Sequence, residues 1–135
     1  MVRAALAGPC LILLIVVGCT SNERYFEVAR EQRAALHEIT DILKTIKDEK
    51  SMADAKTALD EKAKQFEAIA RKAKALPKPP PAEVSKRWQE DEFVIQAEIR
   101  QLAVVVKKVK ELPGGEEFLS QFQSRAPGLF SRVQP

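Results

Sequence analysis

The chain contains 135 residues, enough for one domain, and its formal net charge of +3 favours no particular class of partner. Charged residues make up 30% of the chain and aromatic residues only 6%, a composition that raises the question of disorder. Apolar residues nevertheless recur at helical spacing, and glycine is absent between Thr20 and Pro113. We therefore exclude disorder of the whole chain and expect a helical domain.

The first residues have the pattern of an export signal. Arg3 supplies a positive charge, and the apolar run of residues 11–17 follows it. Gly8 and Pro9 interrupt the apolar segment of residues 4–17. That segment is too short for a membrane-spanning helix, which needs about 20 apolar residues.

The end of this segment, Val16-Val17-Gly18-Cys19, resembles the lipobox of bacterial lipoproteins. The resemblance covers the signal only, and it implies cleavage before Cys19 with diacylglycerol attached to the sulfur. Residues 1–18 would then be a cleaved lipoprotein signal peptide, and residues 19–21 a lipidated tether. The alternatives are an uncleaved N-terminal anchor and ordinary signal cleavage near Thr20.

The same resemblance implies a location in the cell envelope. In lipoproteins generally, Asp after the cysteine is associated with retention in the inner membrane, and Thr20 stands there instead. We therefore expect a lipid-anchored protein on the outer membrane, facing the periplasm, if the host has one. Cys10 would be lost with the signal and Cys19 would be acylated, so the mature chain would have no thiol for a disulfide, a redox motif or a metal site.

Two amphipathic helices are predicted between residues 21 and 76. The first apolar stripe has the spacing of a coiled-coil seam, with one polar member; it comprises Tyr25, Ala29, Gln32, Leu36, Ile39, Leu43 and Ile46. The second stripe comprises Met52, Ala55, Leu59, Ala63, Phe66, Ile69, Ala73 and Leu76. The stripes lie about 140° apart on a continuous helix, which predicts a turn near Lys50. Ser51-Met52-Ala53-Asp54 resembles a helix start, and a single kinked helix is the alternative.

Prolines separate the second helix from a third. Residues 77–81 contain four prolines and cannot be helical, and the third helix is predicted to begin near Pro81. Its stripe comprises Val84, Trp88, Ile95, Ile99, Leu102, Val106, Val109 and Leu112. The β-branched residues 104–106 would also suit a strand, but the helical stripe continues through them. Pro113-Gly114-Gly115 ends the helix.

The predicted fold is all-α: an antiparallel three-helix bundle, up-down-up, over residues 22–113. A short helix over residues 116–123 and an irregular tail around Pro127-Gly128 complete residues 114–135. The alternative is an elongated hairpin that completes its core by dimerising, and self-association stays open in either case. Apolar residues near the C-terminus are expected to cap the bundle, with docking to a partner as the other use; they are Phe118, Leu119, Phe122, Leu129 and Phe130.

The sequence offers little catalytic chemistry. His37 and Asp41 share a helical face, but one such pair is far from a complete metal site and is expected to be a solvated pair. The acidic residues 90–92 point in different directions on a helix, and Gly114-Gly115 lacks the context of a phosphate loop. We therefore expect no enzyme, no metal and no cofactor apart from the covalent lipid on Cys19.

Basic residues surround the proline turn and are candidate contacts with a membrane surface; they are Lys72, Lys74, Lys78, Lys86 and Arg87. In an up-down-up bundle tethered at Cys19, this turn returns to the lipid side. The alternative is a solvated helix end with favourable cation placement. Tyr25 and Trp88 fall at the same end, either as core residues or as an interfacial belt.

These features favour a non-catalytic helical interaction or scaffold module. Its partners would be the membrane, through the lipid anchor, and an envelope protein or a second copy of the chain. Nucleic acid is a poor candidate partner, because the signal implies export and the basic cluster lacks interleaved aromatics. The alternative function is a membrane-tethered carrier or sensor of a small apolar ligand.

Overall fold

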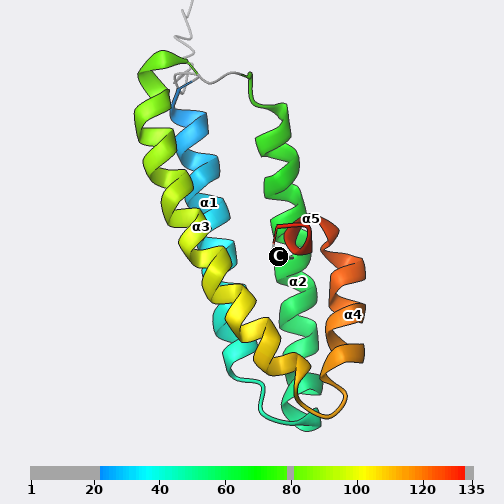
Figure 1. The fold of residues 1–135 in the computed structure, drawn as a ribbon. Coiled ribbons are helices and arrows are strands. Elements are labelled where there is room, and N and C mark those ends of the chain that lie inside the picture. The colour runs from blue at the N-terminus through cyan, green and yellow to red at the C-terminus, as the bar shows by residue number, and fades with distance from the viewer. Residues whose placement is uncertain (1–21, 79–80, 133–135) are drawn as a thin grey trace, which may run out of the picture.

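The computed structural model describes residues 22–78 and 81–132, and over these residues the regular structure is entirely helical. The elements in chain order are α1 (Glu23–Lys44), α2 (Glu49–Ala75), α3 (Ala82–Lys110), α4 (Gly115–Arg125) and α5 (Pro127–Phe130). The three long helices pack together (Figure 1), which confirms the prediction of an all-α fold. None of the described helices combines the length and the apolar character needed to cross a membrane.

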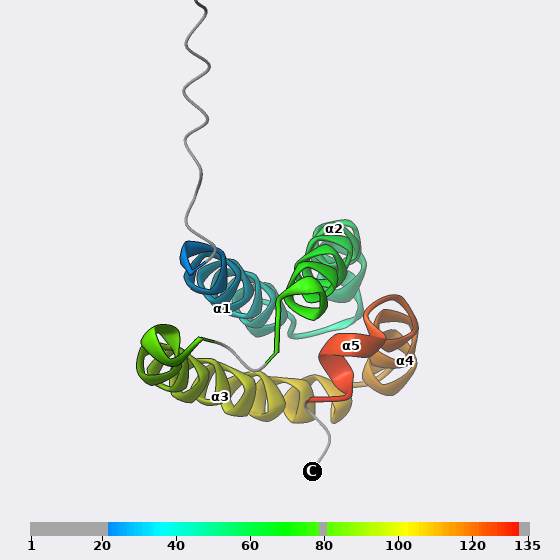
Figure 2. The same ribbon diagram turned by 90° about the horizontal axis from the view of Figure 1, so that it is seen from above.

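Helix α1 is the element on which the other long helices pack. It lies against both α2 and α3, whereas no Cα atom of α2 comes within 8 Å of one in α3. Helix α4 contacts both α2 and α3, and α5 adds a contact with α2. Viewed along the helices in Figure 2, α1 and α4 occupy opposite corners, with α2 and α3 between them. The short C-terminal helix α4 therefore completes the core, as expected from the apolar residues predicted to cap the bundle.

Helix α2 begins with a capping box formed by Asp48 and Ser51. The Asp48 carboxylate accepts a hydrogen bond from the Ser51 backbone N–H at 2.8 Å, and the Asp48 N–H donates to the Ser51 hydroxyl at 3.0 Å. The hydrogen bonds that the Ser51 backbone N–H and the Ser51 hydroxyl donate to the Asp48 carboxylate lower the pKa of this carboxyl. The predicted helix start at Ser51 is therefore wrong: Ser51 is the third residue of α2, and Asp48 is its cap. The alternative of a single kinked helix is also excluded, because α1 and α2 are separate.

Helix α3 begins and ends where its sequence signals indicate. Pro81 precedes its first residue, and residues 104–106 are helical, so the strand alternative is wrong. Gly114 has a φ of 74°, in the left-handed region that favours glycine. A Cβ atom on Gly115 would lie 1.8 Å from the Val109 carbonyl oxygen, so the close approach of α4 to the end of α3 requires glycine there as well.

The core is formed by the predicted stripes and a few additional residues. Every member of the first stripe is buried, including Gln32, which is 5% exposed. Thr40 is also buried, and its hydroxyl donates to the Leu36 carbonyl at 2.8 Å, which satisfies its hydrogen-bonding capacity inside the core. The largest fully buried side chains come from all three long helices and α5; they include Leu36, Ile39, Leu43, Leu59, Phe66, Ile95, Leu102 and Leu129.

Residues 127–130 form a helical turn in which Leu129 and Phe130 are buried, which corrects the prediction of an irregular tail around Pro127-Gly128. Leu129 is fully buried, and the ring of Phe130 packs edge-on against Phe122 with ring centroids 5.4 Å apart. The Gly128 N–H donates to a Glu67 carboxylate oxygen at 3.0 Å, which joins α5 to α2. Pro127 at the first helical position favours this turn, since proline is preorganised there. Of the two uses expected for this segment, the structure shows capping.

Phe66 and Phe93 allow a matched test of the core. Phe66 is 1% exposed and Phe93 is 71% exposed, so truncation of the two rings differs only in burial. We expect Phe66→Ala to lower the free energy of unfolding by about 3–5 kcal/mol, because it removes buried apolar surface and leaves a cavity. Phe93→Ala should change it by less than about 0.5 kcal/mol. Urea denaturation at low protein concentration measures both, and equal losses would contradict the assigned core.

The C-terminal turn offers a second test. Leu129→Ala should lower the free energy of unfolding by about 2–5 kcal/mol, because the side chain is fully buried. Gln123→Ala, at an exposed position of the neighbouring helix, serves as the control. If thermal denaturation shows that removal of residues 127–135 leaves the midpoint unchanged, α5 is not a structural cap.

Candidate membrane-facing site

Three helix ends meet at one end of the molecule: the start of α1, the end of α2 and the start of α3 (Figure 1). The Asn22 side-chain amide donates to a Glu83 carboxylate oxygen at 3.0 Å, which joins α3 to the residue before α1. The Tyr25 hydroxyl donates to the Pro77 carbonyl oxygen, which fixes the connection after α2 to α1. The proline-containing connection is therefore held against the first turn of α1.

The two aromatic residues singled out from the sequence lie together at this end. Tyr25 is 3% exposed, and its ring makes an edge-to-face contact with the half-buried Trp88, with centroids 5.6 Å apart. Such a contact joins α1 to α3 and is worth about 0.5–1.5 kcal/mol beyond burial of the rings. The structure thus places Tyr25 in the core, at the same end as the basic residues.

Two of the five basic residues have partners within the protein. The Lys72 ammonium lies 2.8 and 3.0 Å from the two carboxylate oxygens of Glu31, and this contact raises the pKa of Lys72. The Arg87 guanidinium lies 4.1 Å from the centroid of the Phe26 ring. Both contacts join a flanking helix to α1, and neither partner was foreseen from the sequence.

The other three basic residues, Lys74, Lys78 and Lys86, are exposed and enter no ion pair with the described residues. We call the five residues Lys72, Lys74, Lys78, Lys86 and Arg87 the basic end. Electrostatic attraction to an anionic surface is the chemistry that such exposed ammonium groups offer. Cys19, the predicted lipidation site, lies outside the described residues, four positions before the first residue of α1.

His37 lies between two carboxylates on the surface where α1 meets α3. Its Nε2 is 3.3 Å from Asp41 and its Nδ1 is 3.5 Å from Glu98. A hydrogen bond from Lys44 lowers the pKa of Asp41, with a smaller contribution from His37. Among the described residues, no group of three or more potential ligands is arranged to hold a metal ion. The predicted pair of His37 and Asp41 is observed, and the contact with Glu98 in α3 is an addition to it.

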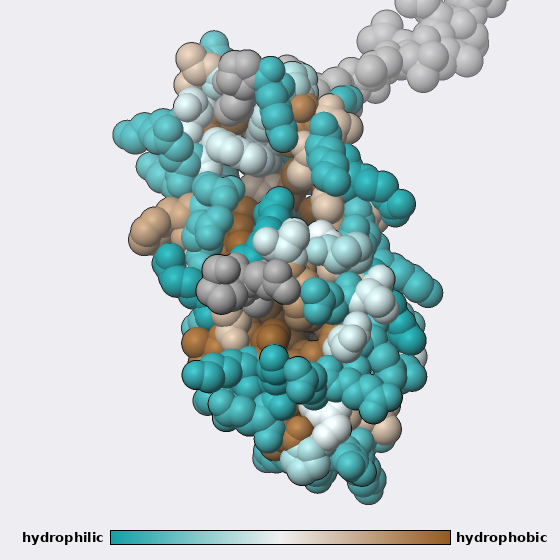
Figure 3. All heavy atoms as spheres, turned by 45° about the vertical axis from the view of Figure 1, so that its right-hand side comes forward, coloured by the Kyte–Doolittle hydropathy of each residue, from teal (hydrophilic) through white to brown (hydrophobic). Residues whose placement is uncertain are grey.

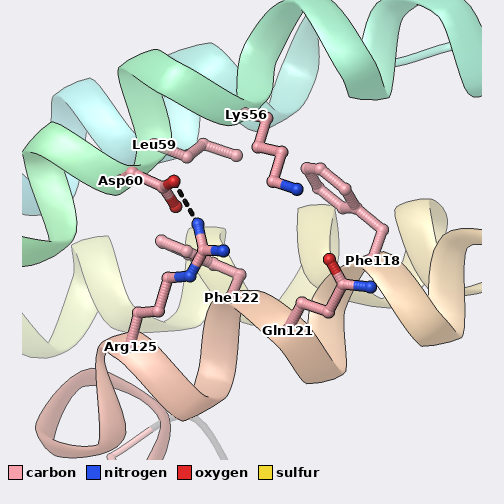
Figure 4. Close-up of a pocket in the computed structure, with 7 residues that line it drawn as sticks. All are labelled: Lys56, Leu59, Asp60, Phe118, Gln121, Phe122 and Arg125. Carbon is pink, nitrogen blue, oxygen red and sulfur yellow. Dashed lines mark ion pairs between the residues drawn. The ribbon is translucent and has the colours of Figure 1, made fainter.

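A small pocket lies between α2 and α4 (Figure 4). Leu59, Phe118 and Phe122 form its apolar side, and an ion pair between Asp60 and Arg125 borders it. Its cavity volume of about 10 Å³ suits roughly one water molecule. This pocket is too small for the apolar ligand that a carrier would hold.

Open grooves with apolar floors run along α3 on the part of the chain that the structure describes. One lies between α3 and the C-terminal helices, over Ile99, Val106 and Phe130. The other lies between α1 and α3, over Leu43, Ile46 and further side chains of α3. Charged side chains cover much of the face drawn in Figure 3, with apolar patches visible between them. Sequence periodicity did not reveal these grooves, because they depend on which helices become neighbours.

Comparison of the chain with protein-family models, curated proteins and solved structures gives no match.

Proposed function

We propose that the chain is a lipid-anchored cell-envelope protein that acts as a non-catalytic helical interaction or scaffold module. The observation that carries this proposal is the sequence Val16-Val17-Gly18-Cys19 at the end of an apolar segment with a preceding positive charge. The proposed location is the outer membrane, facing the periplasm, in a host that has one. The helical domain that follows would hold a protein partner near the lipid surface.

The proposed orientation rests on an up-down-up order of the long helices. Contacts between α1 and α2 run in opposite directions along the two helices, since Glu31 meets Lys72 and Glu38 meets Lys62. Contacts between α1 and α3 run in the same direction, from Tyr25 with Trp88 to His37 with Glu98. These pairs support an arrangement in which the basic end and the tethered start of α1 share one end of the bundle.

The distance between the anchor and the basic end favours contact with headgroups. The first residue of α1 lies four positions after Cys19, and extended chain spans at most about 3.6 Å per residue. The Cα atom of Glu23 therefore lies within about 15 Å of the Cα atom of Cys19. Each cation close to an anionic leaflet contributes on the order of 1 kcal/mol, and salt weakens this attraction. The basic end would thus orient the anchored domain.

The anchor is tested by Cys19→Ser in the complete chain. This change removes the sulfur that would carry the lipid, so incorporation of a fatty-acid analogue should fall to background. Cys10→Ser, which changes the other cysteine of the chain, should leave labelling intact and serves as the control. Mass spectrometry of the mature N-terminus provides the second measurement. An unlabelled wild-type protein that begins at a residue other than Cys19 would refute the lipoprotein assignment.

The orientation is tested with residues 20–135, a fragment that contains every described residue. We expect it to bind vesicles containing anionic phospholipid and to be released by high salt, while neutral vesicles leave it in solution. Reversal of Lys74, Lys78 and Lys86 to glutamate should abolish this binding without unfolding, because exposed charges contribute little to stability.

The matched control reverses Lys47, Lys50 and Lys56, which are exposed and lie at the opposite end of the molecule. Co-sedimentation measures binding, and circular dichroism checks the fold. If both triple variants lose binding equally, the basic end has no special role. If the wild-type fragment binds anionic and neutral vesicles alike, its cations are a solvated helix end.

A further inference from the structure

The outer face of α3 carries apolar side chains that no other described helix covers. Helix α3 packs on α1 and α4, and its opposite face is open in both views of the fold (Figures 1 and 2). The large hydrophobic residues that stand exposed in the described chain are Phe93, at 71%, and Val104, at 57%. They are eleven residues apart on this one helix. Eleven residues make about three turns, so both side chains belong to the same face.

Phe93 and Val104 belong to a longer stripe with the three-four spacing of a coiled-coil seam. We call it the α3 stripe, and its members are Lys86, Glu90, Phe93, Ala97, Arg100, Val104, Lys107 and Glu111. All of them are exposed except Ala97, which is half-buried. Small and apolar residues occupy the middle of the stripe, and ionisable residues occupy its ends. The helix therefore has two seams, one packed on α1 and one facing solvent.

The charges along α3 are strongly asymmetric. Residues 82–98 contain five acidic and two basic residues, whereas residues 99–110 contain four basic residues and none that is acidic. Two copies of α3 aligned in parallel would place like charges opposite each other. Two antiparallel copies would place the acidic half of each helix against the basic half of the other. The helix is thus complementary to an inverted copy of itself.

We propose that the α3 stripe is an interface between two copies of this chain, paired antiparallel about a twofold axis that passes between Ala97 and Arg100. In this register Phe93 faces Val104 of the second copy, and Glu90 faces Lys107 of the second copy. Lys86 likewise faces Glu111 of the second copy. The three-four spacing divides the α3 stripe into two alternating sets of heptad positions. Each facing pair joins a residue of one set to a residue of the other, as antiparallel coiled coils require. Both exposed apolar residues become covered in this pairing.

The apolar layers supply the affinity of this pair, and the charges set its direction. Exposed ion pairs contribute little to affinity, but the like charges that face each other in the parallel alignment repel and disfavour it. The two copies of Arg100 lie near the axis, where their like charges oppose association. Replacement of Arg100 by leucine should therefore tighten the pair, a result that a solvated helix face with no partner would not give.

The antiparallel pair has a defined relation to the membrane. Helix α3 is 29 residues long, or about 44 Å, so the basic ends of the two copies lie at opposite ends of the pair. Two copies anchored in the same membrane can pair in this way only when their helices lie parallel to the membrane surface. Two copies anchored in membranes that face each other can pair with their helices perpendicular to both surfaces. The interface itself depends on α3 alone and does not require the lipid anchor.

Sedimentation of the full chain in a density-matched detergent tests the interface. We expect a monomer–dimer equilibrium in which Phe93→Ser and Val104→Ser each raise the dissociation constant at least tenfold. Glu90→Lys and Lys107→Glu should each weaken the dimer, and the double variant should restore it, because the reversed charges again face each other. Arg100→Leu should lower the dissociation constant at least tenfold. The control is the pair Asp54→Lys and Lys64→Glu, two exposed positions of α2, which should change nothing.

Cysteine cross-linking fixes the register. In a background with Cys10 and Cys19 replaced by serine, a mixture of Phe93→Cys and Val104→Cys chains should form disulfide-linked dimers. Phe93→Cys alone should not, because its two copies would be about 16 Å apart, far beyond the Cα separation of about 7 Å that a disulfide spans. A monomer at all concentrations, a dimer insensitive to the α3 substitutions, or preferential linkage of Phe93→Cys to itself would each overturn the proposal. Binding of a different protein to an intact α3 stripe that never dimerises would do the same.

Discussion

The packing of α1 against two other helices is the interaction on which the rest of the structure depends. Helices α2 and α3 do not touch each other along their backbones, so each is held mainly by the apolar surface of α1. This explains why the buried surface of α1 is wider than a single seam: Val28, Ala35 and Thr40 are buried beside the members of its stripe. A helix with one neighbour needs only a narrow stripe, and a helix with two needs a broad one.

The position of α4 follows from this arrangement. Two helices that share one neighbour leave a gap on their other side, and apolar groups in that gap must be removed from water. Leu119 and Phe122 enter it from α4, and Leu129 and Phe130 close it from α5. Glycine at Gly115 permits the sharp return that brings α4 back along α2. The C-terminal segment therefore completes the core that the longer helices leave open.

Much of the helical structure could be predicted from the sequence, because apolar spacing reports directly which face of each helix is buried. All of the α1 stripe and the α2 stripe as far as Ile69 are buried, and prolines and glycines mark both ends of α3. The start of α2 was misplaced by three residues, because both Asp48 and Ser51 are good capping residues and periodicity cannot choose between them. The capping role of Leu129 and Phe130 was expected, but the helical conformation of α5 was missed because a single turn is too short to show a period.

The candidate site was predictable in outline only. The shared location of the proline turn and the start of α1 follows from helix count and length. The contacts of Lys72 with Glu31 and of Arg87 with Phe26 do not, because they depend on how α2 and α3 are rotated about α1. Those rotations are set by packing across distant parts of the chain. The exposure of Phe93, in contrast, follows from the helical period, because Phe93 lies two residues before the buried Ile95 and thus about 200° around α3 from it.

The late position of α4 and α5 in the chain also bears on how the molecule forms. Pairing of α1 with α2 joins neighbouring segments and has a small loop-closure cost, whereas Gly128 meets Glu67 across 61 residues of sequence. Synthesis proceeds from the N-terminus, so a nascent chain has its three long helices before it has the segment that closes the gap between them. During that interval the side of the core that Leu119, Phe122, Leu129 and Phe130 later cover is open to water.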